Sequence, residues 1–107
     1  MELKRVVVTG LGALTPVGNT VAETWENLVN GVSGAGPITH FDASKFKTQF
    51  ACEVKGFNGA DFIDRKEVRK MDLYTQYAIV AAKEAIADSE MDLEKEDLNR
   101  IGVIYGV

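Results

Sequence analysis

The sequence contains one cysteine, one histidine and two prolines, and it has no apolar run as long as a membrane span. A single cysteine excludes an intramolecular disulfide and a multi-cysteine metal site. Cys52 and His40 alone cannot build a catalytic triad or a zinc site. Because a membrane span or a secretion signal needs a continuous apolar core, we expect neither. The sequence therefore predicts no disulfide, no metal site and no membrane span.

Basic residues are scarce relative to acidic ones. Lys and Arg total 12 against 16 Asp and Glu, which gives a net charge of -4. This balance argues against a protein that coats nucleic acid. Over 107 residues, the 46% hydrophobic and 26% charged fractions are instead typical of a globular chain of one domain.

Two β-branched segments without polar alternation predict strands that are buried on both faces. They are residues 5–9 and residues 101–105, and such strands are typical of parallel sheets covered by helices. Residues 46–54 alternate between apolar and polar side chains, which predicts a half-buried strand with Phe50 and Cys52 on its apolar side. The sequence therefore predicts an α/β fold.

Three helices are predicted. Thr20, with Glu23 three residues later, is a typical helix start, and Asn30-Gly31 is a typical helix end. A short helical stretch is expected over about residues 61–70 and a longer helix over about residues 72–89. The longer segment carries apolar residues at nearly every angle around its axis, so we expect it to be buried on all sides.

These elements need more cover than the chain supplies. The two apolar strands require helices on both faces, and the helix over residues 72–89 requires neighbours all round. The sequence also stops directly after the last predicted strand. We therefore interpret the chain as a piece of a larger α/β fold, poorly stable by itself because it would expose apolar surface.

Gly10 and Gly12 follow the first predicted strand, as glycines do in dinucleotide-binding loops. That fingerprint needs a third glycine or alanine where this chain has Thr15, and Pro16 then delays the helix. A tight turn is the favoured interpretation, and a nucleotide-binding module is the alternative.

The lone cysteine and histidine also favour structural interpretations. Cys52 has no local helix N-terminus or cationic neighbour to activate its thiol, so we expect a small buried apolar side chain. His40 lies in a predicted loop close to Asp42, and we expect it to anchor that loop by hydrogen bonding.

Residues 65–70 carry four positive charges and one negative charge in a chain that is acidic overall. On a helix, Lys66 and Lys70, like Arg65 and Arg69, would crowd one side, and such like-charge pairs reduce stability. The cluster therefore predicts either a surface that attracts an acidic partner or an ordinary solvated face.

Seven short segments, in order along the whole chain, resemble the N-terminus of the β-ketoacyl synthases. The similarity is to the 3-oxoacyl-[acyl-carrier-protein] synthase II type, which elongates fatty acids. The segments are VVVTGLG at 6–12, TPVGN at 15–19, TW at 24–25, HFD at 40–42, FN at 57–58, RKEVRKMD at 65–72 and RIG at 100–102.

The resemblance implies a thiolase-like fold, in which two sheets alternate with helices in α-β-α-β-α layers. Residues 1–107 would be the N-terminal part of the β-ketoacyl synthase N-terminal domain, truncated and without a second domain. The helix over residues 72–89 would lie between the two sheets. The resemblance also implies a cytoplasmic homodimer.

The implied activity is an acyltransferase reaction, the decarboxylative condensation of malonyl-carrier protein with an acyl thioester. It uses a cysteine at a helix N-terminus and two histidines, and no cofactor. In the family these residues lie beyond the position of Val107, and Cys52 and His40 do not match them. We therefore expect no catalytic residue in this chain and no activity from it alone.

The family's carrier-docking surface does have counterparts here. The basic residues that match it are Lys66, Arg69 and Lys70, so the resemblance implies acyl carrier protein as the partner. Two alternatives stay open: a chain-length factor, which is a ketosynthase-like subunit without its nucleophile, and a non-catalytic carrier-binding module.

Overall fold

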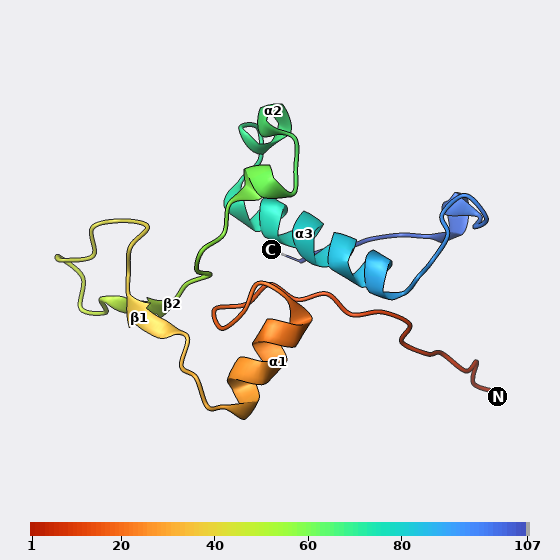
Figure 1. Cartoon of the computed structure of the whole chain (residues 1–107), viewed down its shortest axis with the longest axis horizontal. Coiled ribbons are helices and arrows are strands. Elements are labelled where there is room, and N and C mark those ends of the chain that lie inside the picture. Colours follow the sequence, from red (N-terminus) through yellow and green to blue (C-terminus); the bar gives the residue numbers. More distant parts are fainter. Residues whose placement is uncertain (107) are drawn as a thin grey trace.

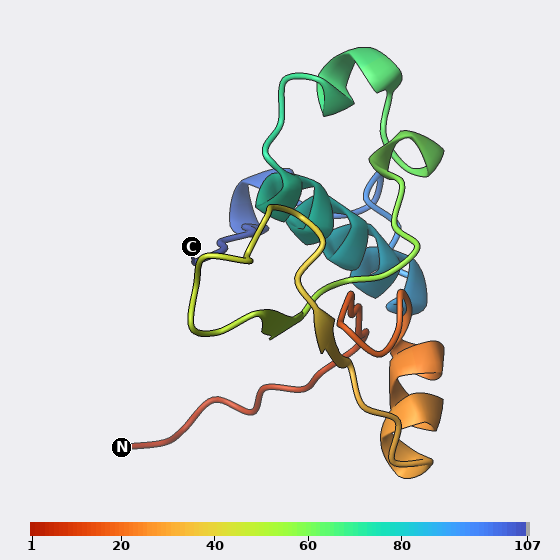
Figure 2. The same ribbon diagram turned by 90° about the vertical axis from the view of Figure 1, so that its left-hand side faces the viewer.

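A computed structural model describes residues 1–106, and its longest helix runs through the middle of the molecule (Figure 1). In both views α1 and α2 lie on opposite sides of α3, and the N-terminal segment runs away from the other elements (Figure 2). The elements are, in chain order, α1 (Val21–Val29), β1 (Ala35–Pro37), β2 (Phe50–Cys52), the 3-10 helix η1 (Gly59–Asp61), α2 (Arg65–Val68), α3 (Leu73–Asp88) and the 3-10 helix η2 (Leu98–Arg100).

Helix α1 confirms the predicted start and end signals. The Thr20 hydroxyl accepts a hydrogen bond from the Glu23 N–H at 3.1 Å, and the Glu23 carboxylate accepts one from the Asn19 N–H at 3.1 Å. Asn30 is the C-cap, and Gly31 follows with a φ of 70°. These contacts satisfy backbone groups that the helix ends leave free.

Helix α3 occupies the predicted place, but its burial differs from the prediction. Within the described residues, Gln76 and Val80 are its buried side chains, whereas Leu73 is 39% and Tyr74 is 52% exposed. Burial on all sides is therefore not observed in this structure, and the exposed side chains agree with the expectation that this piece by itself leaves apolar surface uncovered. The physical reason is that elements of this chain cover only part of its surface.

The two predicted apolar strands are also absent from residues 1–106. Residues 5–9 and 101–105 have no strand assignment, and their side chains are open to solvent, with Val6 88% and Ile104 97% exposed. A strand exists only where a neighbouring backbone supplies ladder hydrogen bonds. Neither segment has such a neighbour here, so neither prediction is met.

Of the strand predicted over residues 46–54, only β2 forms. It pairs antiparallel with β1, and Ala35 lies opposite Cys52. Its faces are reversed relative to the prediction, because Phe50 and Cys52 are exposed and Ala51 is half-buried. The Gln49 amide donates to carbonyls of the preceding loop, so the chain turns there before the strand begins.

The molecule is open, and much of its apolar surface is uncovered. Its radius of gyration is 17.2 Å, whereas a compact chain of this length has about 13 Å. Ala43 and Val80 are the buried hydrophobic side chains of the part described. Across residues 1–106, each helix is too short or too polar to cross a bilayer.

Candidate functional site

The basic segment, residues 65–70, begins in α2 and continues into the turn that leads to α3. Asp64 caps α2, since its carboxylate accepts from the Lys66 N–H at 2.8 Å. All four basic side chains of the segment are exposed: Arg65, Lys66, Arg69 and Lys70. Of the short helix predicted over 61–70, only α2 (Arg65–Val68) forms, after η1 ends at Asp61, and the charged side chains of the basic segment face solvent.

Most of the positive charge in this segment is free of ion pairs. Lys70 Nζ lies 3.4 Å from Glu67 Oε1, with the two side chains 71% and 52% exposed, so the pair contributes little to stability. Within residues 1–106, the other three cations form no ion pair. The Lys70 N–H bonds to the Glu67 carbonyl, three residues back, so the predicted helical spacing of Lys66 and Lys70 is not realised.

Aromatic contacts fasten the stretch before α2 to α3. Phe57 stacks on Phe62 with ring centroids 6.1 Å apart and meets Tyr77 edge-on at 5.0 Å. Burial, and then the negative charge of Glu53, raise the pKa of Tyr77 above its usual value of 10.0. Lys83 on α3 also donates to the Phe62 carbonyl at 2.9 Å.

Gly10 and Gly12 allow the N-terminal loop to lie directly against α3. A side chain at Gly10 would collide with the Ala85 carbonyl, and one at Gly12 with the Ala81 carbonyl. Between the two glycines, the Leu11 N–H donates a hydrogen bond to the Asp88 carboxylate at 2.9 Å. The two glycines therefore serve close packing on α3; the turn of this region lies further on, where the Thr15 N–H and the Gly18 carbonyl are bonded at 2.8 Å.

Glu84 joins the same loop to α1. Its Oε2 accepts from the Ala13 N–H at 3.0 Å, and its Oε1 accepts from the Val21 N–H at 2.9 Å. The half-buried Glu84 carboxylate thus binds two backbone donors that lie 71 and 63 residues before it in the sequence. Hydrogen bonds to a charged acceptor are the stronger ones, so this contact stabilises the attachment of the loop and of the start of α1 to α3.

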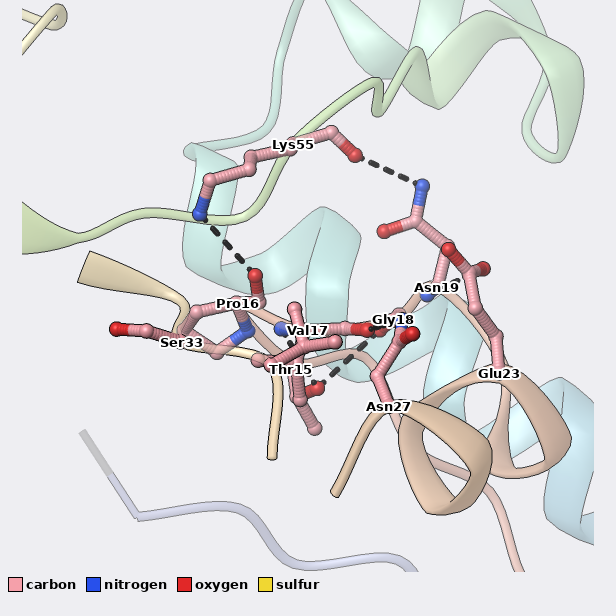
Figure 3. A pocket seen from close by; sticks show the side chains of 10 residues that line it. Thr15, Pro16, Val17, Gly18, Asn19, Glu23, Asn27, Ser33 and Lys55 are labelled. Carbon is pink, nitrogen blue, oxygen red and sulfur yellow. Dashed lines mark hydrogen bonds between the residues drawn. The ribbon is translucent and has the colours of Figure 1, made fainter. Parts of the chain in front are cut away.

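A hollow of about 170 Å³ lies where the turn after Gly12 meets the chain following β2 (Figure 3). Lys55 Nζ donates to the carbonyls of Pro16 at 3.1 Å, Gly34 at 2.7 Å and Glu53 at 2.9 Å. A lysine has three N–H donors, and carbonyls take all of them. The hollow is therefore a structural junction, with no free donor on this lysine for an anionic ligand.

His40 and Cys52 do not form a reactive pair. His40 Nε2 lies 3.9 Å from Glu53 Oε1, and the Thr39 hydroxyl and N–H donate to Glu53 at 2.7 and 3.0 Å. These bonds lower the pKa of Glu53. The His40 backbone N–H also donates to Glu53 at 3.4 Å, so the loop is anchored by Glu53 through backbone groups and Thr39, and the imidazole of His40 forms no hydrogen bond within the described residues. Cys52 is exposed, so its expected burial is wrong. No group of three His, Cys, Asp or Glu that could hold a metal occurs in residues 1–106.

Comparison with known proteins gives a consistent family match. A model of the beta-ketoacyl synthase N-terminal domain matches residues 3–107. The chain is 52% identical over 103 residues to 3-oxoacyl-[acyl-carrier-protein] synthase 2 of Staphylococcus aureus (strain COL), covering 96% of this chain and 25% of that protein. It is 46% identical over 106 residues to the Synechocystis sp. protein of the same name, covering 99% of this chain and 26% of the relative. The chain therefore spans about a quarter of the length of these relatives.

Solved structures give the same fold. The ishigamide ketosynthase/chain length factor superimposes with a TM-score of 0.75 and 36% identity, covering 82% of this chain and 22% of the other. A type II polyketide ketosynthase, solved in complex with its acyl-carrier protein, gives a TM-score of 0.66 and 30% identity. The match covers 92% of this chain and 24% of the other. The predicted thiolase-like fold class is confirmed, whereas the docking role of Lys66, Arg69 and Lys70 stays a prediction.

Sequence reasoning missed the side chains that hold these segments together. Lys55, Gln76 and Glu84 each bond to backbone atoms of another segment. A signal was present for Gln76 and Glu84, because both are polar residues within an otherwise apolar helical stretch. Polar groups in such positions are retained where they have hydrogen-bond partners.

Proposed function

Because the chain belongs to the β-ketoacyl synthase family, we propose that it forms the N-terminal part of a 3-oxoacyl-[acyl-carrier-protein] synthase of fatty-acid elongation. The observation that carries this proposal is identity of 46–52% to synthase 2 proteins over nearly the whole chain. We assign residues 1–107 to the N-terminal domain. We also propose that the enzyme is a cytoplasmic homodimer.

The proposed reaction joins two carrier-bound acyl groups. An enzyme thiolate takes the acyl group from its carrier thioester, malonyl-carrier protein loses carbon dioxide, and the resulting carbanion attacks the enzyme-bound acyl group. The carbon–carbon bond forms as the carbon–sulfur bond to the enzyme breaks. Cys52 lies exposed on β2 and does not match the family's nucleophile, so we assign to this segment carrier docking and not the nucleophile.

The basic segment is proposed to dock an acidic acyl carrier protein through Lys66, Arg69 and Lys70. Its support is the exposure of these side chains and the freedom of Lys66 and Arg69 from ion pairs within the described residues. Positive charges that are not neutralised by neighbours attract an acidic partner and orient its approach. The segment also projects from the molecule on the side of α3 opposite α1, where a partner can reach it (Figures 1 and 2).

The test uses a chimaeric synthase, in which this chain replaces the matching quarter of the Staphylococcus aureus relative. Reversing Lys66→Glu and Arg69→Glu should weaken binding of acyl carrier protein about tenfold to a hundredfold at low salt. The difference should shrink as salt screens the charges. The matched control, Lys45→Glu with Lys47→Glu, reverses two exposed lysines of the β1–β2 loop. Equal affinities for the two double variants would refute the docking assignment.

A second candidate is a chain-length factor, because a similar solved structure, with a TM-score of 0.75, is named as a ketosynthase/chain length factor and so includes that kind of subunit. The two functions differ in whether the protein carries the nucleophile. Incubation of the complete protein with radiolabelled acyl carrier substrate distinguishes them, because only a condensing enzyme becomes covalently labelled. Absence of label with intact carrier binding would favour the chain-length factor.

A further inference from the structure

Helix α2 cannot be stable by its own hydrogen bonds. It has four residues, Arg65–Val68, and an isolated helix of one turn is strongly disfavoured in water. The orientation of its charged side chains therefore depends on contacts with its neighbours. Figure 1 shows α2 at the edge of the molecule, with η1 beside it and α3 below, so few elements are close enough to hold it.

Gln76 supplies such a contact from α3. It is 8% exposed and is the buried polar side chain of the part of the chain described. Its Nε2 donates to the carbonyl of Met71 at 3.3 Å and reaches the carbonyl of Val68 at 3.5 Å. These carbonyls lie on either side of Arg69 and Lys70, so one amide group holds the C-terminal half of the basic segment.

The other side of the same amide faces η1. A side chain at Gly59 would collide with Gln76 Oε1, and it would also lie 3.6 Å from a methyl group of Val68. Gly59 is itself buried. The absence of a side chain at this position therefore leaves space for the Gln76 amide, and η1, α2 and α3 meet around it.

We propose that Gln76 is a positioning residue for carrier docking: its buried amide fixes the backbone at Val68 and Met71, and so presents Arg69 and Lys70 to the carrier. The inference rests on the proposed docking function. It assigns to Gln76 an effect on recognition of carrier-bound substrates and none on the chemistry of condensation.

The test compares two substrates in the chimaeric synthase. Gln76→Met retains an unbranched side chain of similar size but has no N–H donor. With acyl groups carried on acyl carrier protein, we expect KM to rise about threefold to tenfold, the effect of one lost hydrogen bond, with kcat unchanged. With the same acyl group on pantetheine, which is too small to reach the basic segment, KM should not change.

A second variant disturbs the amide from the opposite side. Gly59→Ala leaves the sequence and the charges of α2 unchanged, its contact with Val68 is an ordinary one at 3.6 Å, and it should give the same selective rise in KM. The control is Gln49→Met, because the Gln49 amide also donates to two loop carbonyls, at 3.2 and 3.3 Å, but lies at the β1–β2 hairpin. This control should leave both KM values unchanged. If Gln76→Met does not yield folded protein, Gly59→Ala decides the question.

The outcomes separate this inference from the docking proposal. If reversal of Lys66 and Arg69 leaves the KM for carrier substrates unchanged, the docking proposal fails. If that reversal raises KM and the Gln76 and Gly59 variants do not, the positioning role alone is overturned. A rise in KM for both substrates, or a fall in kcat, shows that Gln76 serves general stability and also overturns it.

Discussion

Replacement of Glu84 by glutamine tests how the N-terminal half of the chain is attached to α3. The carboxylate accepts one hydrogen bond with each oxygen, from Ala13 and from Val21. A glutamine keeps one acceptor and turns a donor toward the other N–H, so one charge-assisted bond is lost. Loss of such a bond costs about 1.5–3 kcal/mol.

The expected result is local and can be measured at the two amides themselves. Since about 1.4 kcal/mol corresponds to a factor of ten, Glu84→Gln should speed hydrogen exchange of peptides containing residues 13–21 about tenfold to 150-fold in the chimaeric synthase. The control is Glu26→Gln on α1, where the carboxylate is exposed and forms no hydrogen bond within the described residues. If hydrogen exchange of residues 13–21 is unchanged in Glu84→Gln, or changes equally in Glu26→Gln, Glu84 does not attach this part of the chain to α3.

Two further predictions concern packing and pH. Gly12→Ala places a methyl group against the Ala81 carbonyl. This overpacking should lower the free energy of unfolding by about 1–3 kcal/mol, and with it the thermal unfolding midpoint. Thr39→Val removes the hydroxyl donor that is the largest cause of the lowered pKa of Glu53, so carboxylate NMR titration should show that pKa rising toward 4.5. Because the pKa of Glu53 is lowered in the folded state, the stabilisation from its hydrogen bonds to Thr39 is fully present above pH 4.5. It is lost as the pH falls through the folded-state pKa.

Each of these predictions has a matched control. Gly36→Ala adds a methyl group at a glycine that faces open space, so it should leave the unfolding midpoint nearly unchanged. Thr48→Val alters an exposed threonine in the same loop region, and it should leave the Glu53 titration as it is. A Gly12→Ala variant as stable as Gly36→Ala would contradict the close packing of the glycine loop on α3.

The predictions for α1 and α3 agreed with the structure, whereas the alternating pattern over residues 46–54 gave only a short strand with reversed faces. Thr20 and Gly31 mark the start and end of α1, because caps act on backbone groups within one turn. The long helix also lies where its composition placed it. Predictions that needed a distant partner did not agree, and the clearest cases are residues 5–9 and 101–105, whose strands require another backbone beside them.

The order of residues alone was enough to predict the ends of α1, the place of α3, the family resemblance and the position of the basic segment. These properties depend on short segments, and each is visible in the order of a few residues. Tertiary structure alone decided which side of α3 is covered, why Gly10 and Gly12 are small, and which polar side chains join separate segments. The physical reason is distance along the chain: Glu84 and Ala13 are 71 residues apart, and a hydrogen bond between such residues leaves no periodic pattern in the sequence.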